Sequence, residues 1–391
     1  MDNARKNVAV LAACQALLFT NNSTAIALNG LVGYALASNK ALATLPVTGY
    51  VVGGALSTLP MSLLMSRIGR RAGFVVGALT GMIGAAICSL ALVRADFWLF
   101  CLGTVVFGIY NAAGQYYRFA AADSASAEFK PKAISLVLAG GVVGGIVGPA
   151  VSTHTVDLLA TRYLGAYLSL IGFMILAIGV LQLLRIPSPA GGSLNAPSRS
   201  LREIMSQPVF IVAVTGAAIG FGVMNLLMTA TPLAMRLCGH PYSAAATVIG
   251  SHVVGMFGPS FFTGHLIRRF GVLQVMMAGA LLLYVVVAIA LSGISVPHFW
   301  FALVLLGIGW NFLYIGGTTL LTDACTPAER AKTQGANDSI IFLTTMLTSF
   351  GSGVLIDAKG WEVLNWLALP FITVAAAAVL WLLARRRFAA A

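Results

Sequence analysis

Two pairs of side chains with soft metal-binding atoms stand out in the second half of this 391-residue chain. Met224 and Met228 lie four residues apart, and so do His252 and Met256. Because an α-helix completes a turn every 3.6 residues, each pair would lie on one face of a helix. Thioether sulfurs favour Cu(I) and bind it without losing a proton. The pairs predict a copper site, with packing in an apolar core as the alternative.

The two pairs are separated by a short polar turn. We expect the flanking helices to pack antiparallel, with Met228 and His252 about 10–14 Å below the end of the helices at 1.5 Å per residue. The turn itself contains three further soft or borderline metal ligands, which we interpret as a place of metal capture at the mouth of the helices: Met235, Cys238 and His240.

The composition requires that these helices lie in a membrane. Hydrophobic residues make up 59% of the chain and charged residues 9%, and the mean hydropathy is +0.92. Apolar runs of about 20 residues are long enough to cross a bilayer as helices. The sequence therefore predicts an all-α polytopic membrane protein with twelve transmembrane helices, at residues 8–36, 45–65, 72–93, 97–117, 133–153, 163–184, 208–235, 243–266, 272–292, 299–321, 336–355 and 363–383.

The basic residues that give the chain its net charge of +12 lie mainly in the loops between these spans. Most of the 23 Lys and Arg residues fall in loops on one side, and the other side receives Lys40, Arg94, Arg162, Arg236 and Lys359. Cytoplasmic loops carry the basic excess, so both termini are expected in the cytoplasm. The charge indicates orientation in a lipid bilayer, and we expect no nucleic-acid partner.

A polar loop divides the predicted spans into two sets of six. Residues 186–207 contain the Pro-, Gly- and Ser-rich run PSPAGGSLNAPSRS. A hydrophilic loop between two six-helix halves is typical of an internally duplicated transporter. We therefore predict an N-terminal half at 1–185, a central cytoplasmic loop at 186–207 and a C-terminal half at 208–391.

The loops after the second and eighth spans carry related basic sequences. Ser66–Arg71 reads SRIGRR, and Arg268–Gly271 reads RRFG. In both position and sequence these loops resemble the G-x-x-x-D-R-x-G-R-R signature that the major facilitator superfamily carries in the same two loops. Ser66 replaces the Asp of the signature in the first copy, and Arg268 replaces it in the second. The resemblance implies that spans 1, 4, 7 and 10 line a central cavity. Polar residues in these spans then become candidates for lining it: Asn21, Asn22, Tyr110, Asn111, Gln115, Trp310, Asn311 and Tyr314.

Ionisable groups are rare inside the predicted spans. No Asp or Glu lies deep in a span, and Asp338, near the start of span 11, comes closest. His252 is the only His well inside one. We interpret Arg118 and Asp123, at the inner end of span 4, as a surface pair. Transporters driven by protons usually place an ionisable side chain in the membrane. Because the predicted spans contain so few, the sequence does not identify the coupling ion.

The pairs Met224/Met228 and His252/Met256 resemble the paired motifs of CcoA-type copper importers. The resemblance implies a transporter of the bacterial inner membrane that imports copper through these four ligands for cytochrome oxidase assembly. Copper is then a substrate, with no resident cofactor, and its cytoplasmic acceptor is unknown. We expect a monomer.

Other functions are considered beside copper import. A sister group takes up riboflavin, whose ring Trp310, Tyr314, Asn311 and Tyr110 could bind by stacking and hydrogen bonds. A drug exporter is disfavoured because such proteins usually contain a buried carboxylate, and no Asp or Glu lies deep in a predicted span. No enzyme activity is expected, since the sequence lacks a phosphate loop, paired carboxylates and a nucleophile with its base.

Overall fold

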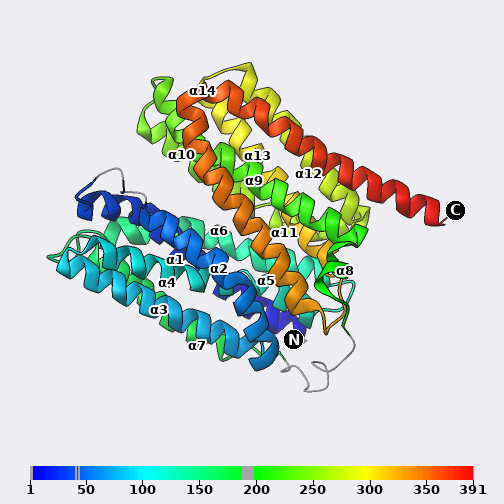
Figure 1. Cartoon of the computed structure of the whole chain (residues 1–391), viewed down its shortest axis with the longest axis horizontal. Helices are drawn as coiled ribbons and strands as arrows, with labels where there is room; N and C mark the ends of the chain where they lie inside the picture. The colour runs from blue at the N-terminus through cyan, green and yellow to red at the C-terminus, as the bar shows by residue number, and fades with distance from the viewer. Residues whose placement is uncertain (1–2, 40–41, 43–44, 187–197, 391) are drawn as a thin grey trace. The chain divides into compact units, whose positions relative to one another are not determined.

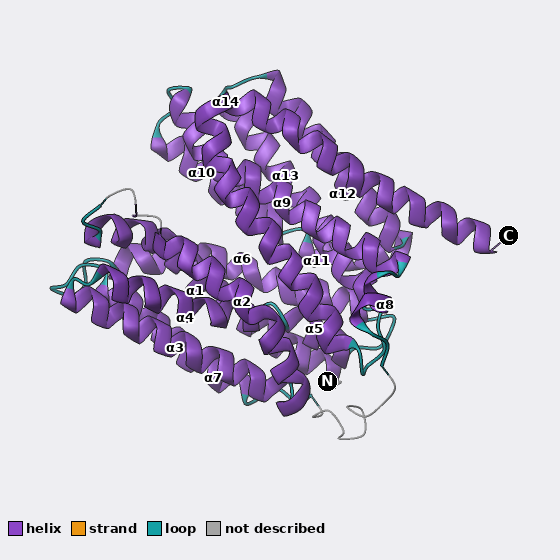
Figure 2. Ribbon diagram, viewed as in Figure 1, coloured by secondary structure: helices purple, strands orange, loops and turns teal. Residues whose placement is uncertain are grey.

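The computed structural model describes residues 3–39, 42, 45–186 and 198–390. These residues form helices joined by turns and contain no strand (Figure 2). The chain divides into two compact units, which are described separately. The predicted all-α architecture is therefore confirmed.

Unit 1 is built from the first part of the chain. Its helices, coloured blue to green in Figure 1, are α1 (Asn3–Leu36), α2 (Leu45–Ile68), α3 (Arg70–Arg94), α4 (Phe97–Gly114), α5 (Tyr117–Ser124), α6 (Lys130–Thr155) from Leu136 onward, and α7 (Leu164–Leu181). Unit 2 contains α8 (Leu201–Met205), α9 (Pro208–Leu237), α10 (Tyr242–Phe257), α11 (Ser260–Phe270), α12 (Val272–Ser292), α13 (Val296–Leu321) and most of α14 (Arg330–Ala390).

Each unit includes one short segment from the other part of the sequence. Ser126–Ser135, at the start of α6, belongs to unit 2, and Gln334–Ser339 of α14 belongs to unit 1. The division into halves at 1–185 and 208–391 with a central loop stays a prediction. Within unit 2 the Ser135 hydroxyl donates to the Ser260 carbonyl and accepts from the Gly264 amide at 3.1 Å.

The helices differ from the predicted spans at two breaks. Ten helices of the described chain are long and apolar enough to cross a membrane. The predicted eighth span is divided into α10 and α11 at Gly258 and Pro259, and the fourth ends at Gly114 before the short α5. The last two predicted spans lie in α14, which breaks at Gly360. There φ is +78°, a value that favours glycine because it has no Cβ.

The predicted central loop is only partly described, since residues 187–197 lie outside the described chain. After it, Ser200 and Glu203 form a reciprocal capping box that starts α8. Arg199 also donates to both carboxylate oxygens of Glu329, at 2.8 and 2.6 Å. These bonds hold the pKa of the Glu329 carboxyl well below its usual range.

Close helix contacts in both units depend on glycine. In unit 1, a Cβ added to Gly144 of α6 would lie 2.6 Å from the Ala16 carbonyl of α1. Ser23 and Thr24 of α1 donate to the carbonyls of Gly144 and Gly148, at 3.1 and 3.0 Å. Small residues let backbones approach closely enough for such bonds, which matters because the apolar tails of a membrane provide no drive for helices to associate.

In unit 2, α10 and α13 approach each other in the same way. A Cβ on Gly255 would lie 2.6 Å from the Val304 carbonyl, and one on Gly307 would lie 2.6 Å from the Met256 backbone nitrogen. This contact fixes the helix that carries His252 and Met256 against α13.

Replacing Gly307 by Ala should lower the stability of unit 2. The added methyl group meets backbone atoms that cannot rotate away, and overpacking of this kind costs about 1–3 kcal/mol. The measurement is the melting temperature of the purified protein in detergent. Gly172→Ala is the matched control, because a Cβ on Gly172 of α7 meets nothing within 4 Å. Equal melting temperatures for the two variants would contradict the packing argument.

Candidate functional site

The predicted polar residues of spans 1 and 4 come together in unit 1. The Asn22 amide of α1 donates to Asn111 Oδ1 of α4 at 2.8 Å, and Gln115 Nε2 donates to the same oxygen at 3.3 Å. Tyr110 and Asn21 interact electrostatically. We call Asn21, Asn22, Tyr110, Asn111 and Gln115 the amide cluster.

Several polar atoms of the amide cluster are buried without a good hydrogen bond. Asn21 and Tyr110 have 0% exposure. Both amide atoms of Asn21, Oδ1 of Asn22 and the Tyr110 hydroxyl find no partner of ordinary geometry in the described chain. A buried polar group left in this state costs about 1–3 kcal/mol. These atoms therefore form a group of donors and acceptors that a polar ligand or water would satisfy.

Aromatic side chains form a second cluster, in unit 2. Trp310 and Tyr314 of α13 stack with ring centroids 5.0 Å apart and planes 21° from parallel. Phe221 of α9 meets both edge-on, at 5.2 and 4.8 Å, and Phe257 of α10 meets Trp310 at 5.7 Å. We call these four residues the aromatic cluster. Trp310 Nε1 is buried and has no partner among the described residues.

The sequence indicated part of the aromatic cluster. The spacing of Trp310 and Tyr314 places them on one helix face, but Phe221 and Phe257 were not predicted. Their contribution depends on how α9 and α10 contact α13, which the sequence pattern does not specify.

Asn311, predicted to line the cavity, is fully hydrogen-bonded inside unit 2. Its Nδ2 donates to the Met256 carbonyl at 2.6 Å and to the Ser260 hydroxyl at 2.7 Å, and its Oδ1 accepts from Thr263 at 2.7 Å. The side chain therefore joins α13 to the break between α10 and α11.

Three of the four predicted copper ligands are buried in unit 2. His252 is 0%, Met224 4% and Met256 8% exposed, while Met228 is half-buried. The His252 Nδ1 pairs with the Leu303 carbonyl at 2.7 Å, and its Nε2 has no partner in the described chain. Helices α9 and α10 contact each other, and both contact α13.

The predicted metal-capture residues are not equally accessible. Met235 is fully buried, whereas Cys238 and His240 are half-exposed. His240 Nε2 pairs with the Ile294 carbonyl at 2.7 Å. Among the described residues, no three His, Cys, Asp or Glu side chains lie close enough together to hold a metal ion.

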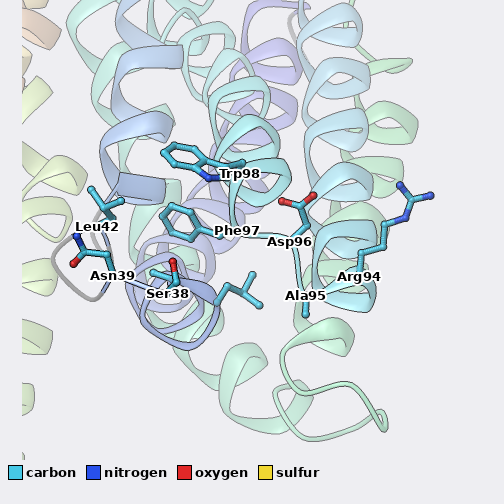
Figure 3. A pocket seen from close by; sticks show the side chains of 10 residues that line it. Ser38, Asn39, Leu42, Arg94, Ala95, Asp96, Phe97 and Trp98 are labelled. Atoms are coloured by element: carbon cyan, nitrogen blue, oxygen red, sulfur yellow. The ribbon is translucent and has the colours of Figure 1, made fainter.

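A surface cavity of about 420 Å³ lies in unit 1, and no residue of the amide cluster lines it (Figure 3). It lies at the end of α1 and the α3–α4 turn, and Arg94, Asp96 and Trp98 are among the side chains around it. None of the predicted site residues lines it.

Arg118 lies in the interior, so the interpretation of Arg118 and Asp123 as a surface pair is wrong. Arg118 is 1% exposed and its Nη2 donates to Asp338 at 2.5 Å. Asp123 accepts from Arg70 Nη2 at 2.9 Å. The sequence placed Asp338 on a span far along the chain and gave no signal that would join it to Arg118.

Replacing Asn311 by Ala should destabilise unit 2 by about 2 kcal/mol, because three interhelical hydrogen bonds of about 0.6 kcal/mol each are lost. Thermal unfolding of the purified variant measures this. Asn365→Ala is the control, since among the described residues the Asn365 amide donates only to Trp361, one turn away in its own helix. An Asn311 variant as stable as the control would show that these bonds contribute nothing.

Apolar helices of membrane-spanning length, with polar clusters buried among them, indicate a polytopic membrane protein. A family model described as "Major Facilitator Superfamily" matches residues 11–271 and 241–391. The chain belongs to the major facilitator superfamily.

Two relatives share the chain's length. The chain is similar to a protein of Brucella anthropi named "Riboflavin transporter RfnT", with 43% identity over 95% of this chain and 94% of the relative. It is also similar to the "Uncharacterized MFS-type transporter YddS" of Bacillus subtilis, with 29% identity over 87% of this chain and 82% of that protein. Both relatives are named as transporters.

Solved structures show the same fold. The human organic anion transporter MFSD10 matches with a TM-score of 0.76 and 13% identity over 96% of this chain and 99% of that one. A bacterial homologue of the iron transporter ferroportin, in an outward-facing state, matches with a TM-score of 0.73 and 13% identity over 96% and 98%. These similarities concern the fold alone.

Proposed function

We propose that this protein takes up riboflavin, or a closely related flavin, across the bacterial inner membrane. The observation that carries the proposal is the 43% identity, over nearly the whole chain, to a relative named as a riboflavin transporter. The relatives thus favour flavin uptake over copper import.

The chemistry of the two clusters supports a flavin substrate. Riboflavin combines a flat aromatic ring system with a pyrimidine edge that holds one N–H donor and several acceptors. Side-chain amides such as those of Asn21 and Asn22 supply both donors and acceptors. Aromatic rings such as Trp310 and Tyr314 stack on flat ligands, and Trp310 Nε1 adds a buried donor.

Transport by this fold would proceed by alternating access. In such transporters two halves rock around a site near the middle of the membrane, which opens first to one side and then to the other. We assign the amide cluster of unit 1 and the aromatic cluster of unit 2, each taken by itself, as candidate substrate-binding groups.

Copper import is the second candidate, and one observation favours it. His252 Nδ1 donates to the Leu303 carbonyl, which leaves Nε2 buried and without a partner among the described residues. A backbone carbonyl that fixes one ring nitrogen is the usual support for a His whose other nitrogen binds metal. Met224, Met228 and Met256 would supply the thioethers.

Cells that depend on external riboflavin provide the test. Expression of the wild type should produce saturable riboflavin uptake, and Asn21→Ala and Trp310→Ala should each reduce it about tenfold at low substrate, the loss expected for 1.4 kcal/mol of binding. Trp310→Phe should retain more uptake than Trp310→Ala because it keeps an aromatic ring. Trp366→Ala is the matched control, since Trp366 is 58% exposed.

Copper accumulation is measured in the same cells. Copper uptake that is lost in His252→Ala and Met228→Ala, with no riboflavin uptake by the wild type, would replace the flavin proposal with copper import. Variant abundance in the membrane, determined by immunoblotting, separates loss of transport from loss of protein.

A further inference from the structure

Unit 1 contains a buried aspartate, and one of its carboxylate oxygens accepts no hydrogen bond from the described residues. Asp338 is 2% exposed and lies in Gln334–Ser339, the segment of α14 that belongs to unit 1. Its Oδ1 accepts from Arg118 Nη2 at 2.5 Å and from Asn337 Nδ2 at 2.6 Å. Its Oδ2 is buried and has no hydrogen-bond partner among the described residues. A proton could therefore bind at Oδ2 without breaking a hydrogen bond.

The other buried acid of the described chain, Glu329, differs in this respect. Its Oε1 accepts from the backbone and Nε of Arg199, and its Oε2 accepts from Arg199 Nη2 and the Thr326 amide. Both oxygens are occupied, which identifies a structural ion pair. The comparison leaves Asp338 as the buried carboxylate suited to gaining and losing a proton.

A chain of side-chain hydrogen bonds connects Asp338 to the amide cluster. Arg118, which donates to Asp338, also donates from Nη1 to Gln115 Oε1 at 3.1 Å. Gln115 Nε2 donates to Asn111 Oδ1, which also accepts from Asn22. A solute that rearranges the amides of Asn22 and Asn111 would therefore act on Arg118 through Gln115.

We propose that Asp338 binds the proton that drives solute uptake, and that Arg118, Gln115 and Asn111 couple this proton to the bound solute. The identity of the solute rests on the function proposed above, whereas the proton site rests on the geometry of unit 1. Asp338 is the proton-binding residue, and Gln115, itself a member of the amide cluster, is a positioning residue that links Arg118 to Asn111.

The proton step changes charge but breaks no covalent bond in the solute. A proton from the outer aqueous phase forms an O–H bond at Asp338 Oδ2 and leaves to the cytoplasm later in the cycle. Arg118 then loses its ionic partner but keeps its Nη1 bonds to the carbonyl and side chain of Gln115, at 2.7 and 3.1 Å. Its charge therefore stays hydrogen-bonded throughout.

The surrounding charges favour release of the proton after transport. Among the described residues, Arg118 and Tyr116 interact electrostatically with Asp338, and Tyr116 also interacts with Arg70. Arg70 binds Asp123 at 2.9 Å and Gln334 at 2.6 Å. Protonation of Asp338 removes the negative charge that the Arg118 guanidinium faces. This cation therefore favours the carboxylate form of Asp338 and the release of the proton.

Protonation would also change how α14 is held. Gln334–Ser339 belongs to unit 1, while the remainder of this helix belongs to unit 2. The Arg118–Asp338 pair is one of the contacts that hold Gln334–Ser339 within unit 1. Protonation of Asp338 weakens this contact and can therefore bias the local position of the segment.

Proton coupling fits the chemistry of the proposed solute. Riboflavin is uncharged near neutral pH, so the membrane potential alone cannot concentrate it. One proton moving with each molecule carries one charge, which corresponds to about fifty-fold accumulation per 100 mV.

Purified protein in proteoliposomes tests the proposal. With the wild type, riboflavin uptake should alkalinise the outer medium, and accumulation should fall as the outside pH rises. The Asp338→Asn protein should show at least tenfold less accumulation and no proton movement. It should nevertheless exchange labelled internal riboflavin for external riboflavin within about threefold of the wild-type rate. Asp157→Asn is the matched control, because Asp157 forms an exposed pair with Arg162.

Two further variants keep the test decisive. If Asp338→Asn fails to fold because Arg118 is left buried without its partner, the double variant Arg118→Gln/Asp338→Asn removes both charges and should show the same loss of coupling. Gln115→Met preserves length but breaks the hydrogen-bond chain, and it should lower the ratio of protons to riboflavin. Concentrative, proton-linked uptake by Asp338→Asn or by the double variant would overturn the proposal.

A measurement without solute separates this inference from the proposed function. The tryptophan fluorescence of the wild type should change with pH as the Arg118–Asp338 pair weakens, and that change should be absent in Asp338→Asn. If the wild type moves no riboflavin but shows this difference, the flavin function fails and the proton site stands. Identical pH profiles for the two proteins would reject the proton site.

Discussion

The fold depends on how backbone polar groups are satisfied where no water is present. In the hydrocarbon region an unpaired N–H or C=O costs several kcal/mol, so the chain forms helices that pair these groups internally. Helices packed in lipid gain little from hydrophobic association, and they need close backbone contact instead. The contacts of Gly144 with α1 and of Gly307 with α10 meet this need. The remaining polar side chains are therefore held in rigid surroundings.

Because little water is present, a buried polar side chain without a hydrogen bond remains available to a ligand. Asn311 forms three interhelical hydrogen bonds and is fully used in the structure. Asn21, by contrast, is equally buried and completes none of ordinary geometry. Both are asparagines in predicted cavity-lining spans, yet one joins helices and the other remains available to a ligand. The distinction depends on neighbouring helices and not on residue type.

This distinction also explains what the sequence could predict. Helix-length apolar runs predicted the all-α membrane fold, because hydrophobicity and length are local properties of the chain. The spacing of Met224, Met228, His252 and Met256 predicted shared helix faces but could not show what each face contacts. The pair between Arg118 and Asp338 joins positions 220 residues apart, and no local pattern encodes such a contact. The break between α10 and α11 at Pro259 was missed because the surrounding residues remain apolar.

The exchange of short segments between the two units has a consequence for biosynthesis. Arg118 leaves the ribosome 220 residues before its partner Asp338. At about 5–20 residues per second, this charge waits on the order of tens of seconds for its counterion. During that interval the nascent first part of the chain must keep Arg118 near water or lipid headgroups. Final burial of this side chain therefore marks a late stage of assembly, after most of the second part of the chain has been translated.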